Sequence, residues 1–506
     1  MIEKSPRLIF IACFFDITSI LIKLVAKSGK MASVNYWIVL IVNAAYIITI
    51  ISCIVVVLKE NRNPIRSLAW VIALIFLPVV GLVFYLFFGR SLKGQHMISR
   101  HNKRKIISRM APRHVNLSNI DLPVADKNLI KLSRALSYSF YTVNNHIDIF
   151  TTGNEKFNAL KQDLRNAKKS IYLQYYIFSD DTTGQEIADI LIRKARDGVD
   201  VKVIYDHVGS FSARSRFFKR MSEAGVETHP FFRVTFPQLA NRINWRNHRK
   251  IVVIDGETGY LGGMNIADRY QNGTSEGIAW RDTHFRLQGD IVESLMYSFI
   301  VDWNFKNNPE TIEYPPMAPV RFRNNTGMQL ITSGPLDSWD NQALCFLKAI
   351  SNATKSIYIQ TPYFLPTDAL QHALEAAALS KIDVRIMIPG KSDSRMLQYA
   401  GYSYVTQCLR AGIKVYLYNP GMLHAKGIII DENLVIAGST NFDYRSFENN
   451  FECSLMIYDK DVNRKMRDIF FNDIKSCTKL TFNTWHKRPI FQRILESIVR
   501  LVSPIL

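Results

Sequence analysis

The chain has 506 residues, with 63 lysine and arginine residues against 43 aspartate and glutamate residues, and a formal net charge of +20. Hydrophobic residues make up 48% of the chain and aromatic residues 12%, which excludes an intrinsically disordered, collagen-like or low-complexity protein. The six cysteines form no C-x-x-C pair, which excludes a zinc ribbon or thioredoxin motif and is typical of a reducing compartment. The length allows about two to four domains. The positive charge predicts a polyanionic partner, either nucleic acid or an anionic membrane.

Two uncharged stretches near the N-terminus predict membrane-spanning helices. They cover residues 36–58 and 69–88, and each is long enough for a helix of about 20 residues that crosses a hydrocarbon core of ~30 Å. Neither stretch has the polar stripe expected of a helix in a soluble core. The second contains Pro78 and Gly81, which membrane helices tolerate.

The charges beside these stretches predict their orientation. Residues 59–68 carry three basic side chains, whereas residues 90–113 carry a denser cluster of eight. The positive-inside rule therefore places the chain that follows the second span in the cytoplasm. A third apolar stretch, residues 8–22, is short and contains Asp16. It can be an uncleaved signal-like segment, an interfacial helix or a further span, and the sequence leaves these alternatives open.

From about residue 120 the chain has the pattern of a soluble α/β protein, and this pattern occurs twice. Residues 167–174 (AKKSIYLQ) return as residues 353–360 (ATKSIYIQ), and each copy indicates a helix end that leads into a buried strand. Two later pairs of matching segments follow in the same order: residues 200–204 with 383–387, and residues 224–226 with 411–413. Two long copies indicate a duplicated domain rather than a solenoid, and the proline-containing residues 314–319 are the expected seam.

These patterns divide the chain into six parts. We expect an apolar N-terminal segment, a two-span transmembrane region, a basic juxtamembrane linker, a first α/β half, a second α/β half and an amphipathic C-terminal tail, at residues 1–34, 36–88, 89–129, 130–315, 316–485 and 486–506. The apolar spacing in the tail predicts either docking on a membrane surface or packing against the domain, and both alternatives stay open.

One repeated pattern carries reactive side chains. The pattern H-x-K-x4-D-x6-G-[GS]-x-N occurs once in each copy, as His248, Lys250, Asp255 and Asn265, and as His424, Lys426, Asp431 and Asn441. On average composition, a single chance match in a chain of this length has odds of about one in a hundred thousand. Two matches at equivalent points of a duplication therefore indicate a shared function.

The spacing predicts that these side chains meet at one small site. Alternate residues of an extended strand share a face, so His248 projects with Lys250 and His424 with Lys426. The apolar residues that follow continue as a buried strand, and the glycine pair permits a turn that returns the asparagine to the same edge. Lysine and amide donors suit phosphate oxygens. Two imidazoles can divide the roles of nucleophile and general acid–base.

Both copies resemble the double H-x-K-D signature of the phospholipase D superfamily, and the resemblance covers about residues 130–480. It implies that His248 attacks phosphorus to give a covalent phosphohistidine, and that His424 protonates the leaving alcohol and then activates the incoming one. It implies four phosphate-binding side chains: Lys250, Asn265, Lys426 and Asn441. Asp255 and Asp431 complete the catalytic motif, and we expect them to order the strand and turn rather than touch substrate.

The resemblance also implies a carboxylate downstream of each motif that bonds the second ring nitrogen of a histidine. Asp282 and Glu452 occupy matching strand positions, and such a partner would set the tautomer of the imidazole. The alternative is that both are ordinary surface carboxylates. No metal or other cofactor is expected, because the chain has no H-E-x-x-H motif and no Cys/His cluster.

The fold class expected is therefore α/β, with a duplicated phospholipase D-type domain, two mixed sheet-and-helix halves sharing one active site, and N-terminal transmembrane helices. The whole order of parts resembles the bacterial cardiolipin synthases. That resemblance implies transfer of a phosphatidyl group between two phosphatidylglycerol molecules, in a multi-pass protein of the bacterial cell membrane whose catalytic part is cytoplasmic. Another phospholipase D-type transferase or hydrolase is the alternative. A nuclease is disfavoured, since no basic and aromatic stacking platform is evident, and no nucleic-acid partner is expected.

Overall fold

The computed structural model describes residues 32–59, 64–85, 89, 117, 120–234, 244–274, 276–305 and 326–503. The apolar stretch 8–22, the whole basic cluster 90–113 and the expected seam at 314–319 lie outside these residues. The chain forms two compact units, an N-terminal unit of residues 1–90 and a C-terminal unit of residues 91–506. Each unit is described by itself.

Helices α2, α3 and α4 form the N-terminal unit, at Ala32–Lys59, Pro64–Phe76 and Pro78–Phe84. Helix α2 contains the first apolar stretch. The expectation of one helix through residues 69–88 is wrong at Leu77, which has φ −126° and ψ 63° and separates α3 from α4. Pro78 accounts for the break, because its ring disfavours a helical conformation in the preceding residue. Among the helices that the structure describes, none is both long enough and apolar enough to cross a membrane. The two expected spans stay a prediction.

The first half of the C-terminal unit is built on a sheet of seven strands among the described residues, in the order β1-β8-β6-β5-β2-β3-β4. Strands β2, β3 and β4 are parallel, whereas β5, β6, β8 and β1 are antiparallel to their neighbours. The strands in chain order are Asn145–Phe150, Ser170–Tyr175, Asp200–Asp206, Glu227–Phe231, Ile251–Ile254, Thr258–Gly262 and, for β8, His284–Gly289. Helices α7, α8, α9 and α11 cover Gly153–Asn166, Thr182–Arg196, Ser215–Glu223 and Ile291–Trp303.

The second half repeats this arrangement in a sheet of eight described strands, in the order β19-β13-β12-β10-β15-β16-β18-β9. Its strands β9, β10, β12, β13, β15, β16, β18 and β19 cover Gly327–Ser333, Ser356–Gln360, Asp383–Pro389, Lys414–Tyr418, Gly427–Ile430, Leu434–Gly438, Glu452–Tyr458 and Cys477–Lys479. Helices α12, α13, α14 and α16 cover Asn341–Asn352, Asp368–Leu379, Arg395–Ala411 and Lys460–Ile474. The repeated segments of the sequence are the equivalent strand pairs β2 and β10, and β3 and β12. The α/β class with two mixed sheets is confirmed.

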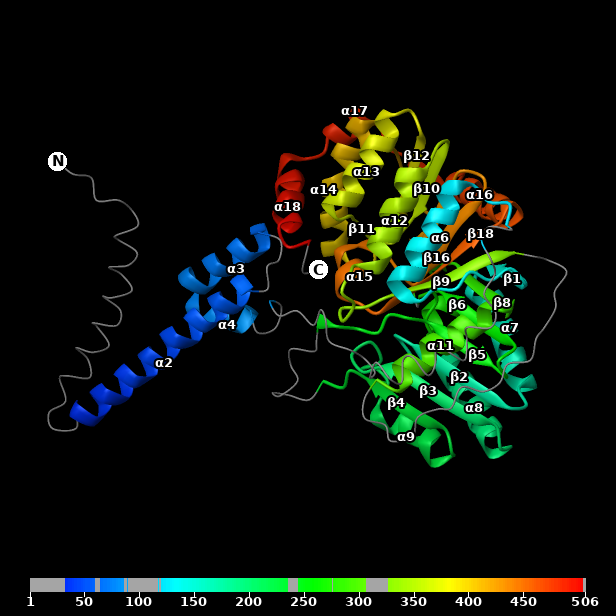
Figure 1. Ribbon diagram of the computed structural model, residues 1–506, viewed down its shortest axis with the longest axis horizontal. Helices are drawn as coiled ribbons and strands as arrows, with labels where there is room; N and C mark the ends of the chain where they lie inside the picture. The colour runs from blue at the N-terminus through cyan, green and yellow to red at the C-terminus, as the bar shows by residue number, and fades with distance from the viewer. Residues whose placement is uncertain are drawn as a thin grey trace. The chain divides into compact units, whose positions relative to one another are not determined.

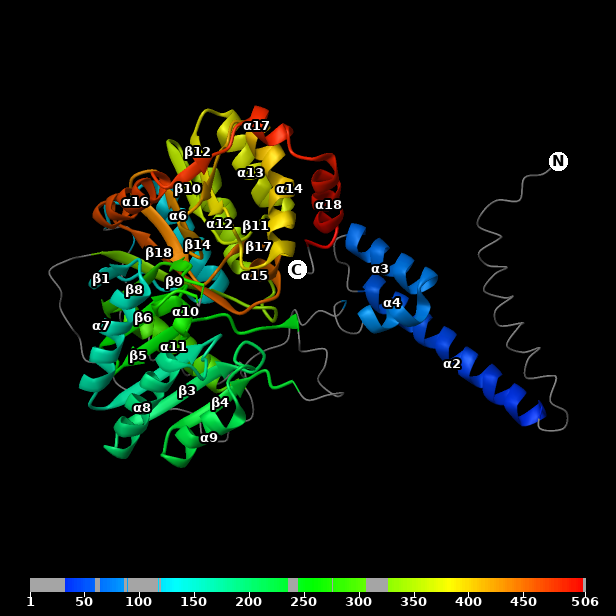
Figure 2. The ribbon, with the colours of Figure 1, turned by 180° about the vertical axis from the view of Figure 1, so that it is seen from behind.

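The two halves lie side by side in both ribbon views (Figures 1 and 2) and share a hydrophobic core. One cluster of buried apolar residues combines Phe299 and Trp303 of α11 in the first half with Leu330, Val435 and Phe451 of the second half. Helix α6 (Val124–Ser137) precedes β1 in the chain, yet it packs against β9 and α12 of the second half. Because apolar surface is buried between the halves, they form one body, and a site between them has fixed walls.

Candidate active site

The two histidine–lysine pairs lie at equivalent ends of central strands. Lys250 directly precedes β5, and Lys426 directly precedes β15. In the first half, β6 ends and β8 begins at this same end of the sheet, since Gly262 at the end of β6 pairs with His284 at the start of β8. In the first copy Arg249 points the other way and pairs with Asp302 at 2.7 Å, as the strand alternation predicts.

Each histidine is held by the other half of the protein. The backbone N–H of His248 donates to the carbonyl oxygen of Phe451 at 2.9 Å, and its ring Nδ1 lies 2.9 Å from Oε1 of Glu452. The backbone N–H of His424 donates to the carbonyl oxygen of Arg281 at 2.7 Å, and its Nδ1 lies 2.6 Å from Oδ2 of Asp282. One short ladder, between β7 (Ala279–Arg281) and β14 (Gly421–Leu423), and one isolated bridge, between Asn247 and Phe451, also join the halves. The site is therefore composite.

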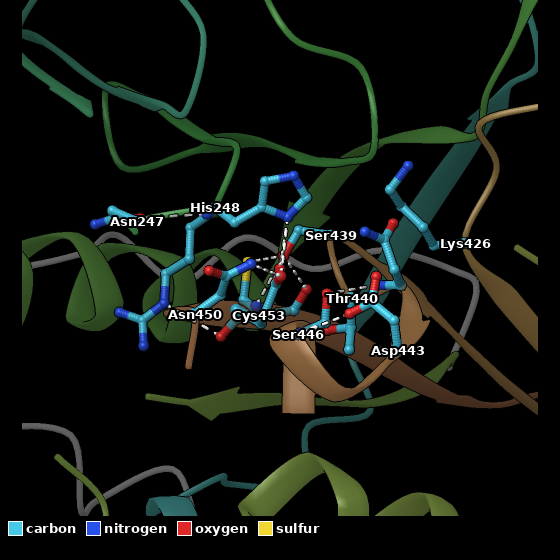
Figure 3. Close-up of polar contacts among 12 residues, drawn as sticks. Asn247, His248, Lys426, Ser439, Thr440, Asp443, Ser446, Asn450 and Cys453 are labelled. Atoms are coloured by element: carbon cyan, nitrogen blue, oxygen red, sulfur yellow. Dashed lines mark hydrogen bonds and ion pairs between the residues drawn. The ribbon is translucent and has the colours of Figure 1, made fainter. Parts of the chain in front are cut away.

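The carboxylates are held by their own halves in two different ways. Ser439 donates its hydroxyl to Oε2 of Glu452, and Asn450 donates its amide to Oε1 at 3.3 Å (Figure 3). The equivalent of Ser439 in the first half is Gly263, where an added β-carbon would lie 2.1 Å from Oδ1 of Asp282. The same position of the motif therefore helps to place both carboxylates. In the second half the Ser439 hydroxyl bonds Glu452, and in the first half Gly263 leaves room for Asp282 because it has no side chain.

Burial sets the protonation of the two imidazoles. His248 and His424 are 8% and 6% exposed, and burial lowers the pKa of each to about 4, because the low-dielectric interior disfavours the charged ring. Burial acts to raise the pKa of Asp282 and Glu452, but the positive charges beside them outweigh it and hold both below their usual range. At neutral pH the free protein therefore holds neutral imidazoles against ionised carboxylates, which leaves Nε2 of each ring without a proton.

Both motif lysines are buried in the same site. Nζ of Lys250 donates to the carbonyl oxygen of His248 at 2.6 Å, and Nζ of Lys426 donates to the carbonyl oxygen of His424 and lies 2.7 Å from its Nδ1. Burial lowers the pKa of Lys250 to about 7 and that of Lys426 to about 8. Nearby positive charge lowers these pKa values further, since Lys426 acts on Lys250 and on His424, and Lys250 acts on His248. A phosphate diester has the negative charge and the acceptor oxygens to bind both ammonium groups.

The two motif asparagines are buried near this edge but differ in their contacts. Oδ1 of Asn265 accepts from the backbone N–H of Ile177 at 3.1 Å, and its amide nitrogen donates to the Tyr270 hydroxyl at 2.7 Å. Oδ1 of Asn441 is buried with no hydrogen-bond partner among the described residues. The amides are therefore not equivalent, although they occupy the same position of the motif.

The motif aspartates lie apart from the histidine–lysine cluster, at the far ends of β5 and β15. Asp255 accepts hydrogen bonds from the backbone N–H groups of residues 168, 169 and 170, at 2.7–2.9 Å. Asp431 accepts the equivalent bonds from residues 354, 355 and 356, at 2.7–3.2 Å. Both have a positive φ, 56° and 51°. Each carboxylate thus ties the turn after its own strand to the start of the neighbouring repeated strand.

The comparisons with known proteins agree with this geometry. Residues 160–303 and 346–474 match the family described as "Cardiolipin synthase, PLD-like domain", and residues 44–90 match "Phospholipase_D-nuclease N-terminal". The chain belongs to the cardiolipin synthase family of the phospholipase D superfamily. It is 40% identical over 475 residues to the major cardiolipin synthase of Bacillus subtilis, covering 91% of this chain and 98% of that protein. It is 37% identical over 476 residues to the cardiolipin synthase of Oceanobacillus iheyensis, covering 92% and 99%.

A solved structure shares the fold of this cardiolipin synthase family member. The phosphatidylserine synthase of Haemophilus influenzae superposes with a TM-score of 0.59 and 18% identity, covering 76% of this chain and all of that chain. At this identity the likeness concerns the fold alone.

Three aromatic side chains of this cardiolipin synthase family member were missed by sequence reasoning. The ring of Tyr176 lies edge-on to the ring of His248 at 4.9 Å, and the rings of Trp280 and Tyr270 lie 5.4 and 5.5 Å from that of His424. A signal was present, because Tyr176 directly follows the repeated strand β2, whose end lies at the edge that carries the motif. These rings exclude water from one side of each imidazole and restrict its orientation.

Proposed function

We propose that this protein transfers a phosphatidyl group from one phosphatidylglycerol molecule to another, giving cardiolipin and glycerol. The observation that carries the proposal is the composite site, in which each motif histidine contacts a carboxylate of the opposite half, with both motif lysines buried beside them. Family membership supports the same reaction, since relatives that align over nearly their full length are cardiolipin synthases.

In the first step, Nε2 of His248 attacks the phosphorus of the donor lipid. The bond between phosphorus and the glycerol oxygen breaks, and His424, protonated once the anionic substrate is bound, gives its proton to that oxygen. Glycerol leaves, and the phosphatidyl group stays on His248. Contact with Asp282 stabilises the imidazolium form of His424, and contact with Glu452 directs Nε2 of His248 toward phosphorus.

In the second step, the terminal hydroxyl of another phosphatidylglycerol gives its proton to His424 and attacks phosphorus. The bond between phosphorus and Nε2 of His248 breaks, cardiolipin leaves, and the protonated His424 is ready for the next cycle. Lys250 and Lys426 would hold the non-bridging oxygens, on which negative charge accumulates in both transition states. The side-chain N–H groups of Asn265 and Asn441 are the further candidates for donating to phosphate oxygens, since an amide oxygen accepts and cannot bind them.

Labelled substrates test this function. The purified full chain, incubated with phosphatidylglycerol labelled in its headgroup glycerol and acyl chains, should release glycerol and form a four-chain lipid in equal amounts. His248→Ala should abolish both products, and rapid denaturation of the parent enzyme in detergent at neutral to alkaline pH, where the P–N bond survives, should trap a phosphatidyl group on His248. Retained turnover in His248→Ala would refute the covalent mechanism.

The products distinguish the proposed reaction from two alternatives that use the same chemistry. Phosphatidic acid without cardiolipin would indicate a hydrolase, and products formed only from other alcohols would indicate a different phosphatidyltransferase. Cleavage of DNA in a parallel incubation, with no lipid product, would indicate a nuclease. The first alternative differs only in the acceptor of the second step, where water would replace the lipid hydroxyl.

We also propose that residues 36–58 and 69–88 anchor the protein in the membrane with the chain from residue 89 onward in the cytoplasm. Their uncharged sequence, the basic cluster of residues 90–113 and the match of residues 44–90 support this proposal. The proposal includes the domain boundaries expected from the sequence, which lie after residues 129, 315 and 485. In inside-out and right-side-out vesicles, protease should degrade the C-terminal unit only in the inside-out preparation. Degradation in both would contradict the anchoring.

A further inference from the structure

The C-terminal helix packs on the domain through a face that contains both Glu496 and Val499. Helix α18 (Ile490–Arg500) lies along α14 at the outer edge of the second half in both ribbon views (Figures 1 and 2). Glu496 faces the domain, is 2% exposed, and accepts hydrogen bonds from Arg488 and, at 3.0 Å, from Gln492. Arg500 donates to Gln407 of α14 at 3.1 Å. Val499 packs against the apolar core of the second half, and the Arg500 guanidinium lies 4.3 Å from the ring centroid of Tyr404 on α14, so the face of α18 that meets the domain is part polar and part apolar.

The opposite face of α18 exposes five large apolar side chains. They are Ile490, Phe491, Ile494, Ile498 and Leu501, at 73%, 76%, 51%, 57% and 81% exposure. Their spacing places them on one side of the helix. A helix on a soluble protein usually buries its apolar stripe against the core, whereas here these five apolar side chains stay exposed. A contiguous exposed apolar patch of this kind marks an interaction surface.

The charges around this apolar face are cationic. Between residues 482 and 503 the sequence has Lys487, Arg488, Arg493 and Arg500 and a single acidic residue, Glu496. Because Glu496 is buried and bonded by Arg488, it leaves no exposed negative charge on the segment. Lys487 and Arg493 are exposed beside the apolar side chains. An apolar face with basic flanks is complementary to the surface of an anionic bilayer.

We propose that α18 is an interfacial helix that inserts its apolar face into an anionic lipid leaflet and holds the C-terminal unit against the membrane. The partner is the bilayer surface itself, with acyl chains for the five apolar residues and lipid phosphates for Lys487 and Arg493. This inference goes beyond the proposed reaction, since it concerns docking and can be measured without turnover.

Helix α14 connects the docking helix to the active site. It begins after Ser394, next to Asp393, whose carboxylate accepts a hydrogen bond from the Tyr363 hydroxyl at 2.8 Å. Tyr363 directly precedes β11 (Phe364–Leu365), which pairs with β17 (Phe442–Asp443) directly after the motif asparagine Asn441, so this end of α14 lies near the site. Met396, in the first turn of α14, is 46% exposed. Docking through α18 would therefore set the orientation of the site relative to the lipid surface.

Site-directed labelling tests the proposal on the full chain. Ile494→Cys, reconstituted into phosphatidylglycerol-containing vesicles, should react with a membrane-impermeant maleimide about tenfold more slowly than in detergent, after subtraction of the parent chain's labelling. The matched control is Lys465→Cys, on an exposed position of α16, which should react equally in both. The same protection should be largely lost in pure phosphatidylcholine vesicles.

Three results would overturn the proposal. They are equal labelling of Ile494→Cys in detergent and in anionic vesicles, equal protection in neutral vesicles, and protection in detergent that increases with protein concentration. The last would show that a second copy covers this face. A second variant, Ile494→Glu/Ile498→Glu, should turn over detergent-dispersed lipid as the parent does but lose about tenfold in turnover on anionic vesicles. Equal turnover of the variant and the parent on vesicles would also contradict the proposal. If the parent turned over neither substrate but showed the expected labelling, the proposed reaction would be wrong and the docking proposal would stand.

Discussion

Glu452 of the second half lies 2.9 Å from Nδ1 of His248 of the first half, and this contact crosses between the two copies of the duplication. Asp282 and His424 make the reciprocal contact at 2.6 Å. Neither half therefore contains a complete histidine–carboxylate pair. A change that separates the halves would disable both histidines at once, because each loses the group that sets its tautomer.

Glu452→Gln should reduce kcat by about 10²–10⁴-fold while the protein stays folded. The amide keeps the shape of the side chain but has no charge to stabilise a positively charged ring, and only one of its two terminal atoms can accept from Nδ1–H. Initial rates of glycerol release measure the effect, with the thermal unfolding midpoint as a check on folding. Glu432→Gln is the matched control, since Glu432 is exposed and pairs with Lys355. A rate for Glu452→Gln within about twofold of the parent would contradict the positioning role.

Gly263→Ala should reduce turnover strongly, by about 10²-fold, although it adds a single methyl group. The added β-carbon would lie 2.1 Å from Oδ1 of Asp282, so the carboxylate must move away from His424. Gly401→Ala is the control, because the nearest atom to its β-carbon would be the Phe364 carbonyl oxygen at 3.4 Å and helix α14 favours alanine. Equal turnover in the two variants would show that Asp282 is not held by this close approach.

Asp255→Asn and Asp431→Asn should lower stability rather than catalysis. Each carboxylate accepts three backbone N–H groups, so the free energy of unfolding should fall by about 1–3 kcal/mol for each. Asparagine is chosen because it tolerates the positive φ at both positions, which separates lost hydrogen bonding from backbone strain. Urea unfolding and kcat are measured together, with the exposed Asp461→Asn as control. A loss of kcat comparable to that of His248→Ala, with stability unchanged, would give these residues a catalytic role instead.

The KM for phosphatidylglycerol should rise as pH increases from about 6.5 to 9. A lysine is cationic below its pKa, and burial lowers the pKa of Lys250 to about 7 and that of Lys426 to about 8. The empty site therefore holds both positive charges below pH 7 and loses them as the pH rises through these values, which weakens binding of an anionic lipid. Lipid binding to His248→Ala, measured over the same range, separates binding from chemistry. A KM that is constant or falls toward pH 9 would contradict the role of the two lysines.

Much of the structure of the C-terminal unit could be predicted from the sequence, because the patterns that predict it lie within short segments. The match of residues 167–174 with 353–360 predicted two equivalent strands, and these are β2 and β10. The alternation of His248, Arg249 and Lys250 predicted which side chains share a face, and Arg249 indeed pairs with Asp302 on the other side. By contrast, the expected helix through residues 69–88 ends at Leu77, where Pro78 has a stronger effect than the apolar pattern.

The sequence by itself determined the duplication, the α/β class and the residue types of the site, since periodicity and motif spacing are properties of neighbouring residues. Only the tertiary structure decided that Glu452 partners His248 and Asp282 partners His424, because those contacts depend on short strands that pair across the two halves. It likewise decided which face of α18 points outward. An amphipathic pattern predicts that one side of a helix is buried. The surface of α14, on which α18 packs, determines which side of α18 that is.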